Sequence, residues 1–270
     1  MKTKFKLLCG AVALSLAGQA YAATDWVLTT AAATNPTGGY TTTAGGSTVV
    51  ARGWADTGTG SPMILEQQTA PGNFRKYTGG LGINNLDGCA TGGTCGDPGD
   101  VASTAPEHAI DNEARYEMVL LSFTQSVKLT NVNFGWVGTD SDYTVLAYTP
   151  SVAPVLTGTT WASVKLNSDW NKIGSYANAV AGTNNAINTA NVYSSYWLIG
   201  AYNPLAGTDN GYTATSFDYV KLASVTGVVC VGGTGPNCGT PPSQVPEPGS
   251  LALVGFALMG MVGLRKRRQV

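Results

Sequence analysis

The sequence predicts an all-β domain, an antiparallel β-sandwich or jelly roll, followed by a linker and one C-terminal transmembrane helix. Composition is the first reason for the β class. The 270 residues include 35 glycines and 13 prolines, and only 11% are charged, a glycine-rich, charge-poor balance that favours many short strands and turns. Periodicity is the second reason. Apolar residues alternate at period two between clusters of Gly, Asn, Asp and Pro, and no long helical period interrupts them.

The first 22 residues have the layout of a signal peptide. Lysines open the chain, the apolar run 7–18 follows, and small residues precede the expected cleavage point. We expect signal peptidase to cut between Ala22 and Ala23. Lipid modification of Cys9 is the alternative, but such a cysteine would follow an apolar stretch, whereas Cys9 lies within the start of this one.

Residues 23–229 are expected to form one β-sandwich ectodomain. The segment 115–124 is apolar on both faces at its centre, as in an inner strand covered on both sides, and the alternation in 127–136 changes phase at Asn131, which predicts a bulge. We expect loops at 87–100 and 179–191. The predicted strands are Trp26–Thr30, Thr48–Trp54, Met63–Gln67, Arg115–Thr124, Val127–Trp136, Tyr143–Thr149, Trp170–Tyr176, Tyr196–Tyr202 and Phe217–Val225.

Four cysteines of the exported chain form two short-range pairs in glycine-rich stretches. Local disulfides, Cys89 with Cys95 and Cys230 with Cys238, are favoured because each stretch can bring its own ends together. Zinc is the competing interpretation. It lacks both the CxxC spacing and a second histidine.

The charge balance argues against a nucleic-acid partner. Without the two basic ends of the chain, 8 basic residues remain against 15 acidic ones, which gives the interior a net charge of about −7. A nucleic-acid binder needs a basic face instead.

The C-terminal region is divided into a Gly/Pro-rich linker at 230–245 and a segment at 246–270. In that segment an apolar stretch covers 249–264, and its 16 residues would extend through roughly 24 Å of a ~30 Å hydrocarbon core as a helix. The basic tail 265–270 then predicts a helix whose C-terminal end stays in the cytoplasm. This topology agrees with an exported domain.

A Pro-Glu-Pro tripeptide, an apolar helix and a basic tail follow one another in this segment. This order resembles the PEP-CTERM sorting signal of Gram-negative bacteria. The residues that carry the resemblance are Pro246, Glu247, Pro248, Arg265, Lys266, Arg267 and Arg268. The resemblance implies an inner-membrane precursor, cleavage by an exosortase near the tripeptide, and a mature protein at the cell surface or in the exopolysaccharide matrix. No ligand follows from it.

Longer blocks of the ectodomain resemble a family of exosortase-dependent surface proteins. These blocks are 111–123, 135–148, 196–203 and 218–222. The resemblance implies location and architecture, and it carries no enzymatic activity. We therefore expect a non-enzymatic surface or matrix protein with a structural or adhesive β-domain.

Candidate catalytic residues each have a simpler interpretation. Asp56 begins an Asp-Thr-Gly tripeptide typical of aspartic proteases, but no second copy exists and a turn is favoured. His108 is the only histidine and lacks a Gly-x-Ser-x-Gly companion, so an exposed polar role is favoured over that of a general base. Glu113 and Glu117 would be the carboxylates of a glycosidase, yet their spacing does not support the assignment. A secreted hydrolase is the weakest alternative.

Asp140 and Asp142 are candidate calcium ligands, because two aspartates one residue apart can offer carboxylate oxygens to a hard cation. The cluster of Glu107, Asp111 and Asn112 is considered with them as a further source of oxygen ligands. A hairpin-turn role is favoured over this one, so we expect no cofactor, with calcium as the alternative. Exopolysaccharide is the other candidate ligand, through aromatic rings on one exposed face; burial in the core is favoured for these rings. They are Tyr143, Tyr148, Trp170, Tyr176, Tyr193, Tyr196, Trp197 and Tyr202.

Overall fold

The structure is a computed structural model of the chain and describes residues 23–29, 38–57, 62–67, 73–85, 108–113, 115–138, 140–207, 217–230 and 238. This part of the chain is all-β, as the sequence predicts. Thirteen strands form one hydrogen-bonded sheet in which all the strand pairs are antiparallel. The strands are β1 Thr24–Val27, β2 Tyr40–Ala44, β3 Ser47–Thr57, β4 Met63–Gln67, β5 Phe74–Tyr77, β6 Gly80–Ile83, β7 Ile110–Asp111, β8 Glu117–Val137, β9 Tyr143–Tyr148, β10 Trp170–Tyr176, β11 Asn184–Ala186, β12 Ser194–Ala201 and β13 Tyr219–Val229.

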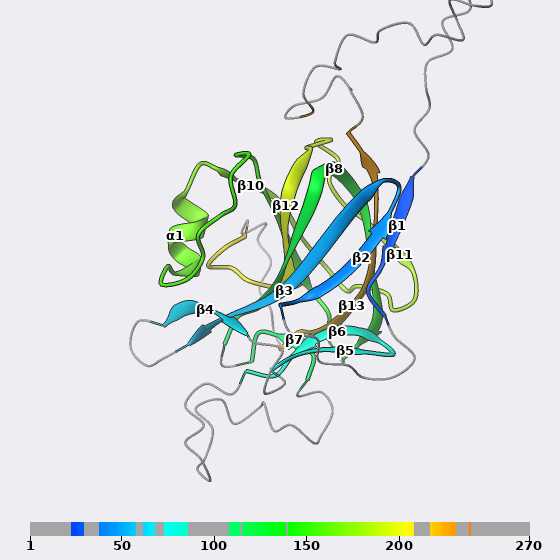
Figure 1. Cartoon of the computed structure of the whole chain (residues 1–270). Helices are drawn as coiled ribbons and strands as arrows, with labels where there is room; N and C mark the ends of the chain where they lie inside the picture. Colours follow the sequence, from blue (N-terminus) through cyan, green and yellow to red (C-terminus); the bar gives the residue numbers. More distant parts are fainter. Residues whose placement is uncertain are drawn as a thin grey trace, which may run out of the picture.

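The long strand β8 joins two halves of the sheet. Its first part pairs with β3 and β12, and its second part pairs with β13 and β11. The sheet bends over along this strand (Figure 1), so that the two halves enclose a common core. Leu121 and Trp197 enter this core from one half, and Phe134 and Val225 enter it from the other.

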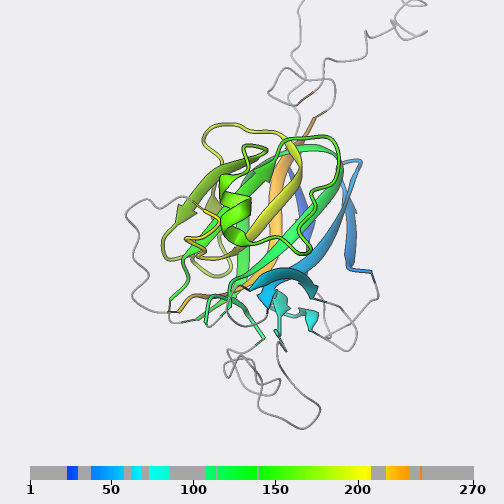
Figure 2. The same cartoon turned by 90° about the vertical axis from the view of Figure 1, so that its left-hand side faces the viewer.

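A second apolar cluster lies on the outer face of the first half, beneath the short helix α1 Trp161–Leu166 (Figure 2). The hydroxyl of Thr160 caps this helix by accepting a hydrogen bond from the backbone amide of Ser163. Alternation along β8 sends Leu121 into the first core and Leu120 into the second. The prediction that 115–124 is covered on both faces is therefore confirmed.

Several predicted strands match the structure closely. The bounds of β4 and β10 agree with the predicted 63–67 and 170–176. The predicted bulge is present, because β13 changes register against β8 between the partners Asn131 and Leu129. The separate strands predicted at 115–124 and 127–136 are one continuous strand. β2, β5, β6, β7, β11 and α1 were not predicted, and β11 lies in the expected loop 179–191.

The far end of β13 carries a disulfide. Cys230 and Cys238 are bonded, with 5.5 Å between their Cα atoms, as the local pairing predicts. The backbone amide of Cys230 also donates to the carbonyl of Ser126, which fixes the end of the strand to β8. The predicted Cys89–Cys95 disulfide, the signal peptide and the segment 246–270 lie outside the described residues. Among the described residues, no helix has the length and apolar character needed to span a membrane.

Candidate functional site

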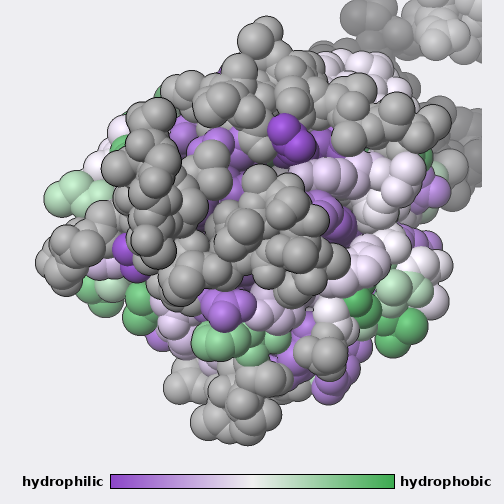
Figure 3. Space-filling model, turned by 90° about the horizontal axis from the view of Figure 1, so that it is seen from below, coloured by the Kyte–Doolittle hydropathy of each residue, from purple (hydrophilic) through white to green (hydrophobic). Residues whose placement is uncertain are grey.

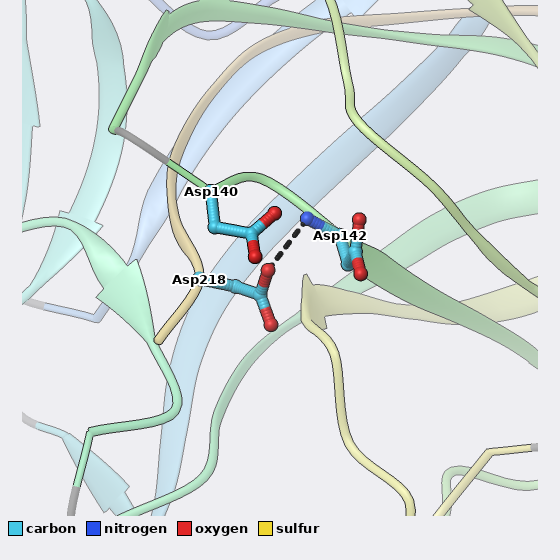
Figure 4. Close-up of side chains that lie close together, drawn as sticks. All are labelled: Asp140, Asp142 and Asp218. Carbon is cyan, nitrogen blue, oxygen red and sulfur yellow. Dashed lines mark hydrogen bonds between the residues drawn. The ribbon is translucent and has the colours of Figure 1, made fainter. Parts of the chain in front are cut away.

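Three carboxylates converge where β13 begins. One carboxylate oxygen from each of Asp140, Asp142 and Asp218 lies within 4.8 Å of the other two. Figure 4 shows the three side chains gathered between the connection that precedes β9, which carries Asp140 and Asp142, and the start of β13, next to Asp218. Asp142 and Asp218 are buried, with 4% and 0% exposure, whereas Asp140 is half-buried.

Backbone contacts hold these two segments together. Asp140 and Asp218 form an isolated parallel bridge, and the amide of Tyr219 donates to the carbonyl of Asp140 at 3.2 Å. The amide of Asp142 donates to Oδ1 of Asp218 at 2.8 Å. β8 and β9 are not neighbours in the sheet, because β12 lies between them. The expected hairpin turn at Asp140 and Asp142 is therefore wrong: the chain here crosses from one half of the sheet to the other.

Asn112, directly after β7, adds a third segment to the cluster. Its Nδ2 donates to Oδ2 of Asp218 at 2.7 Å and to the carbonyl of Tyr202 at 2.9 Å, and its Oδ1 accepts from the amide of Asp218 at 2.8 Å. These bonds link the start of β13, the end of β12 and the loop after β7. Asp218 is thus the centre of a polar network that connects distant parts of the chain.

Burial makes the ionised form of Asp218 costly. Desolvation raises its pKa to about 7, although the amide of Asp142 and the side chain of Asn112 donate hydrogen bonds that favour the charged form. The negative charges of Asp142 and Asp140 raise the pKa further. The cluster therefore has two ways of relieving repulsion, a proton on Asp218 or a bound cation.

The donor set fits a hard cation, for which carboxylate oxygens are the preferred ligands. The same carboxylates also stabilise the backbone. Oδ1 of Asp140 accepts from the amide of Ser141 at 3.0 Å, and Oδ1 of Asp142 accepts from the amide of Asn178 at 2.8 Å. Asp218 was not among the predicted ligands, because it is far from Asp140 in sequence and no motif connects them.

The candidate catalytic residues have hydrogen-bond partners of their own. The carboxylate of Asp56 accepts from the amide of Tyr116 at 2.7 Å, and burial raises its pKa. Glu117 is buried and accepts from the amide of Asp111 at 3.2 Å, while Glu113 accepts from the hydroxyl of Tyr219. The turn expected at Asp56 is wrong, because Asp56 lies within β3, which pairs with β4 and β8. Glu117 and Glu113 bind different partners.

His108 and the candidate aromatic face also have defined places. The imidazole of His108 packs against the ring of Tyr77, with 4.7 Å between centroids, and the residue is half-buried rather than exposed. Five of the eight rings considered as a sugar platform are buried, so that platform does not form as a single exposed face; they are Tyr143, Tyr148, Trp170, Trp197 and Tyr202.

Comparison with known proteins gives a match at the C-terminal end. No curated protein and no solved structure matches the chain. One family model does match, over residues 244–268, and its description is the PEP-CTERM protein-sorting motif. The matched stretch contains the tripeptide, the apolar run and the basic residues on which the resemblance was based. The chain therefore carries a PEP-CTERM protein-sorting motif at residues 244–268.

Proposed function

We propose that this protein is a secreted, exosortase-processed component of the cell surface or exopolysaccharide matrix, with a structural or adhesive β-domain. The observation that carries the proposal is the sorting motif at 244–268. A sorting signal of this kind implies export and a precursor held at the membrane before processing. The signal peptide expected at residues 1–22 supplies the export step.

The disulfide at the end of β13 supports an exported location. Disulfides persist in oxidising compartments and are rare in the cytosol. Cys230–Cys238 lies between the β-domain and the motif, so it would form once the domain has crossed the inner membrane. The basic residues after the apolar run would keep the end of the chain on the cytoplasmic side.

A structural role for the domain fits its construction. A single antiparallel sheet bends around one core, and a second core lies beneath α1. A surface protein benefits from such packing, because a continuous buried core resists local unfolding and proteolysis. A carbohydrate-binding module is the alternative, and a secreted hydrolase is the weaker one.

Calcium binding is a second candidate function, and it would stabilise the domain. It is favoured by one observation: Asp218 brings a third carboxylate to the two that the sequence suggested. Asp140, Asp142 and Asp218 would hold the ion, and its charge would offset the repulsion among them. The ion would join the connection before β9 to the start of β13, so the domain would melt at a higher temperature in calcium than in a chelator.

Fractionation of cells that lack the exosortase tests the proposed function. The unmodified chain should reach the surface or medium in the parent strain and accumulate in the inner membrane, with its C-terminal segment intact, in the deletion strain. Complementation with the exosortase gene should restore the parent distribution. An equal distribution of the processed protein in both strains would contradict the proposal.

A further inference from the structure

A second polar cluster lies at the β5–β6 hairpin, which packs against the beginning of β13. We call it the Lys221 cluster, and it consists of Arg75, Tyr77, Trp136 and Lys221. Lys221 comes from β13, Trp136 from the end of β8, and Arg75 and Tyr77 from β5. The hairpin lies at the lower end of the molecule in Figure 1, and Figure 3 views that end, where hydrophilic side chains in purple reach the surface.

The Lys221 ammonium lies over two aromatic rings. Its Nζ lies 4.6 Å from the centroid of Tyr77 and 5.1 Å from that of Trp136. Lys221 is 8% exposed, and among the described residues no carboxylate or carbonyl oxygen is recorded within bonding distance of its Nζ. A buried ammonium held by rings alone is incompletely compensated, because cation–π contacts replace only part of its hydration.

Arg75 adds a second positive charge to the same side of the hairpin. Its guanidinium interacts with the hydroxyl of Tyr77 and opposes the rise in the pKa of that tyrosine. Nε of Arg75 is buried and has no hydrogen-bond acceptor among the described residues. Two cations thus contact one tyrosine, one above its ring and one at its hydroxyl.

Burial lowers the pKa of Lys221 to about 8. A nearby carboxylate would act in the opposite direction. Among the described residues the cluster is therefore a local excess of positive charge, in a chain whose sequence between its two basic ends carries about −7. Such a local excess selects an anion, because the remaining surface repels it.

We propose that the Lys221 cluster binds a carboxylate-bearing saccharide, the acidic sugar unit of a polysaccharide. The sugar carboxylate would bind the Lys221 ammonium through a charge-assisted hydrogen bond, and the positive charge of the Arg75 guanidinium would strengthen this contact. Trp136 is half-buried, and the open part of its ring would contact the apolar C–H face of the sugar. The inference deepens the carbohydrate-binding alternative, with a site different from the buried aromatic residues considered first.

The full chain, exported by its host and extracted in detergent, provides the test through affinity electrophoresis. The gels contain polygalacturonate, neutral dextran or polyglutamate, each at low and physiological salt. Polygalacturonate should retard the protein in both salts, whereas dextran and polyglutamate should not do so at physiological salt. Equal retardation by polyglutamate would replace a saccharide site with non-specific attraction of polyanions. Absence of retardation by polygalacturonate would overturn the proposal.

Two lysine variants assign the binding to this cluster. Lys221→Met keeps the length of the side chain and should weaken binding to polygalacturonate about tenfold, as expected for loss of one charge-assisted contact. Lys128→Met is the matched control, because it changes the net charge by the same amount. Nζ of Lys128 also lies over an aromatic ring, 5.8 Å from the centroid of Tyr193, but Lys128 is not part of the Lys221 cluster. Its binding should stay within twofold of the unmodified protein.

Arg75→Gln provides an independent variant if Lys221→Met does not fold, and melting curves establish which variants are folded. Arg75→Gln should also weaken binding several-fold. Unchanged binding in folded Lys221→Met or Arg75→Gln, or an equal loss in Lys128→Met, would contradict the assignment. The assay uses purified protein, so its outcome is independent of the sorting proposal.

Discussion

The carboxylate of Asp218 accepts a hydrogen bond from the backbone amide of Asp142 at 2.8 Å, across 76 residues of sequence. This bond joins the start of β13 to the segment that enters β9, and Asn112 binds the other carboxylate oxygen. The bond places two buried carboxylates side by side with Asp140 near both. The ionisation of one aspartate is thereby coupled to the packing of three chain segments.

Replacement of Asp218 should change how stability depends on pH. The pKa of Asp218 is raised from 3.8 to about 7 in the folded protein, so the folded state holds a proton that the unfolded state has lost between these values. Its contribution to stability is fully present below about pH 4 and is lost as the pH rises through about 7. The difference in free energy of unfolding between Asp218→Asn and the unmodified protein should therefore shift in favour of the variant by a few kcal/mol as the pH rises from 4 to 7.5.

Urea unfolding in a chelating buffer at several pH values measures this difference. Asp169→Asn is the control, because Asp169 lies outside the carboxylate cluster and the change in charge is the same. Parallel pH profiles for Asp218→Asn and the unmodified protein would show that Asp218 does not titrate in this range.

Calcium should stabilise the domain more at neutral than at acidic pH. A calcium ion and a proton compete for Asp218, so millimolar calcium should raise the melting temperature by several degrees at pH 7.5 and much less at pH 5. Asp140→Asn and Asp142→Asn should each remove most of the rise, and Asp169→Asn should keep it. Equal melting temperatures in calcium and in chelator at pH 7.5 would leave the carboxylates with their backbone-binding role alone.

Leu121 should be among the most costly positions to truncate. It is fully buried in β8, opposite Ala51 of β3 and Trp197 of β12, so neighbouring strands cannot easily close the space left by its side chain. Leu121→Ala should lower the free energy of unfolding by about 2–5 kcal/mol. Leu166→Ala, at an 86% exposed position, should change it by less than about 0.5 kcal/mol. Denaturant unfolding of both variants checks the contrast, and equal losses would place the core elsewhere.

Peptide mapping without reduction should recover Cys230 linked to Cys238 and Cys89 linked to Cys95. The first link closes a loop with a sequence separation of 8 residues, so its loss should cost stability near the low end of the usual ~2–4 kcal/mol. Its position at the end of β13 also limits its effect on the core. A link between Cys89 and Cys230 would refute the local pairing.

Alternation predicted the strands whose two faces differ in polarity or that are rich in apolar residues, such as Met63–Gln67 and Trp170–Tyr176. It missed Tyr40–Ala44, where successive threonines conceal the period, and Gly80–Ile83, where two glycines suggest a turn. These segments become strands because a neighbouring strand supplies the hydrogen bonds, and that pairing is not encoded within the segment.

The candidate sites were predictable only where their residues are close in sequence. Asp140 and Asp142 are separated by one residue and attracted attention for that reason, whereas Asp218 joins them only after β13 has paired with β8. Lys221 gave no sequence signal either. Its two rings come from β5 and β8, so the cluster exists only in the folded sheet.

The most direct test of the central claim is replacement of the tripeptide by alanines in the full-length chain. The Pro246→Ala, Glu247→Ala, Pro248→Ala variant keeps the apolar run and the basic tail, so it should still enter the membrane while losing the sequence expected to be read during processing. Immunoblots of fractionated cells should show an uncleaved precursor in the inner membrane and none of the protein at the surface. Normal maturation and surface delivery of this variant would contradict the sorting assignment.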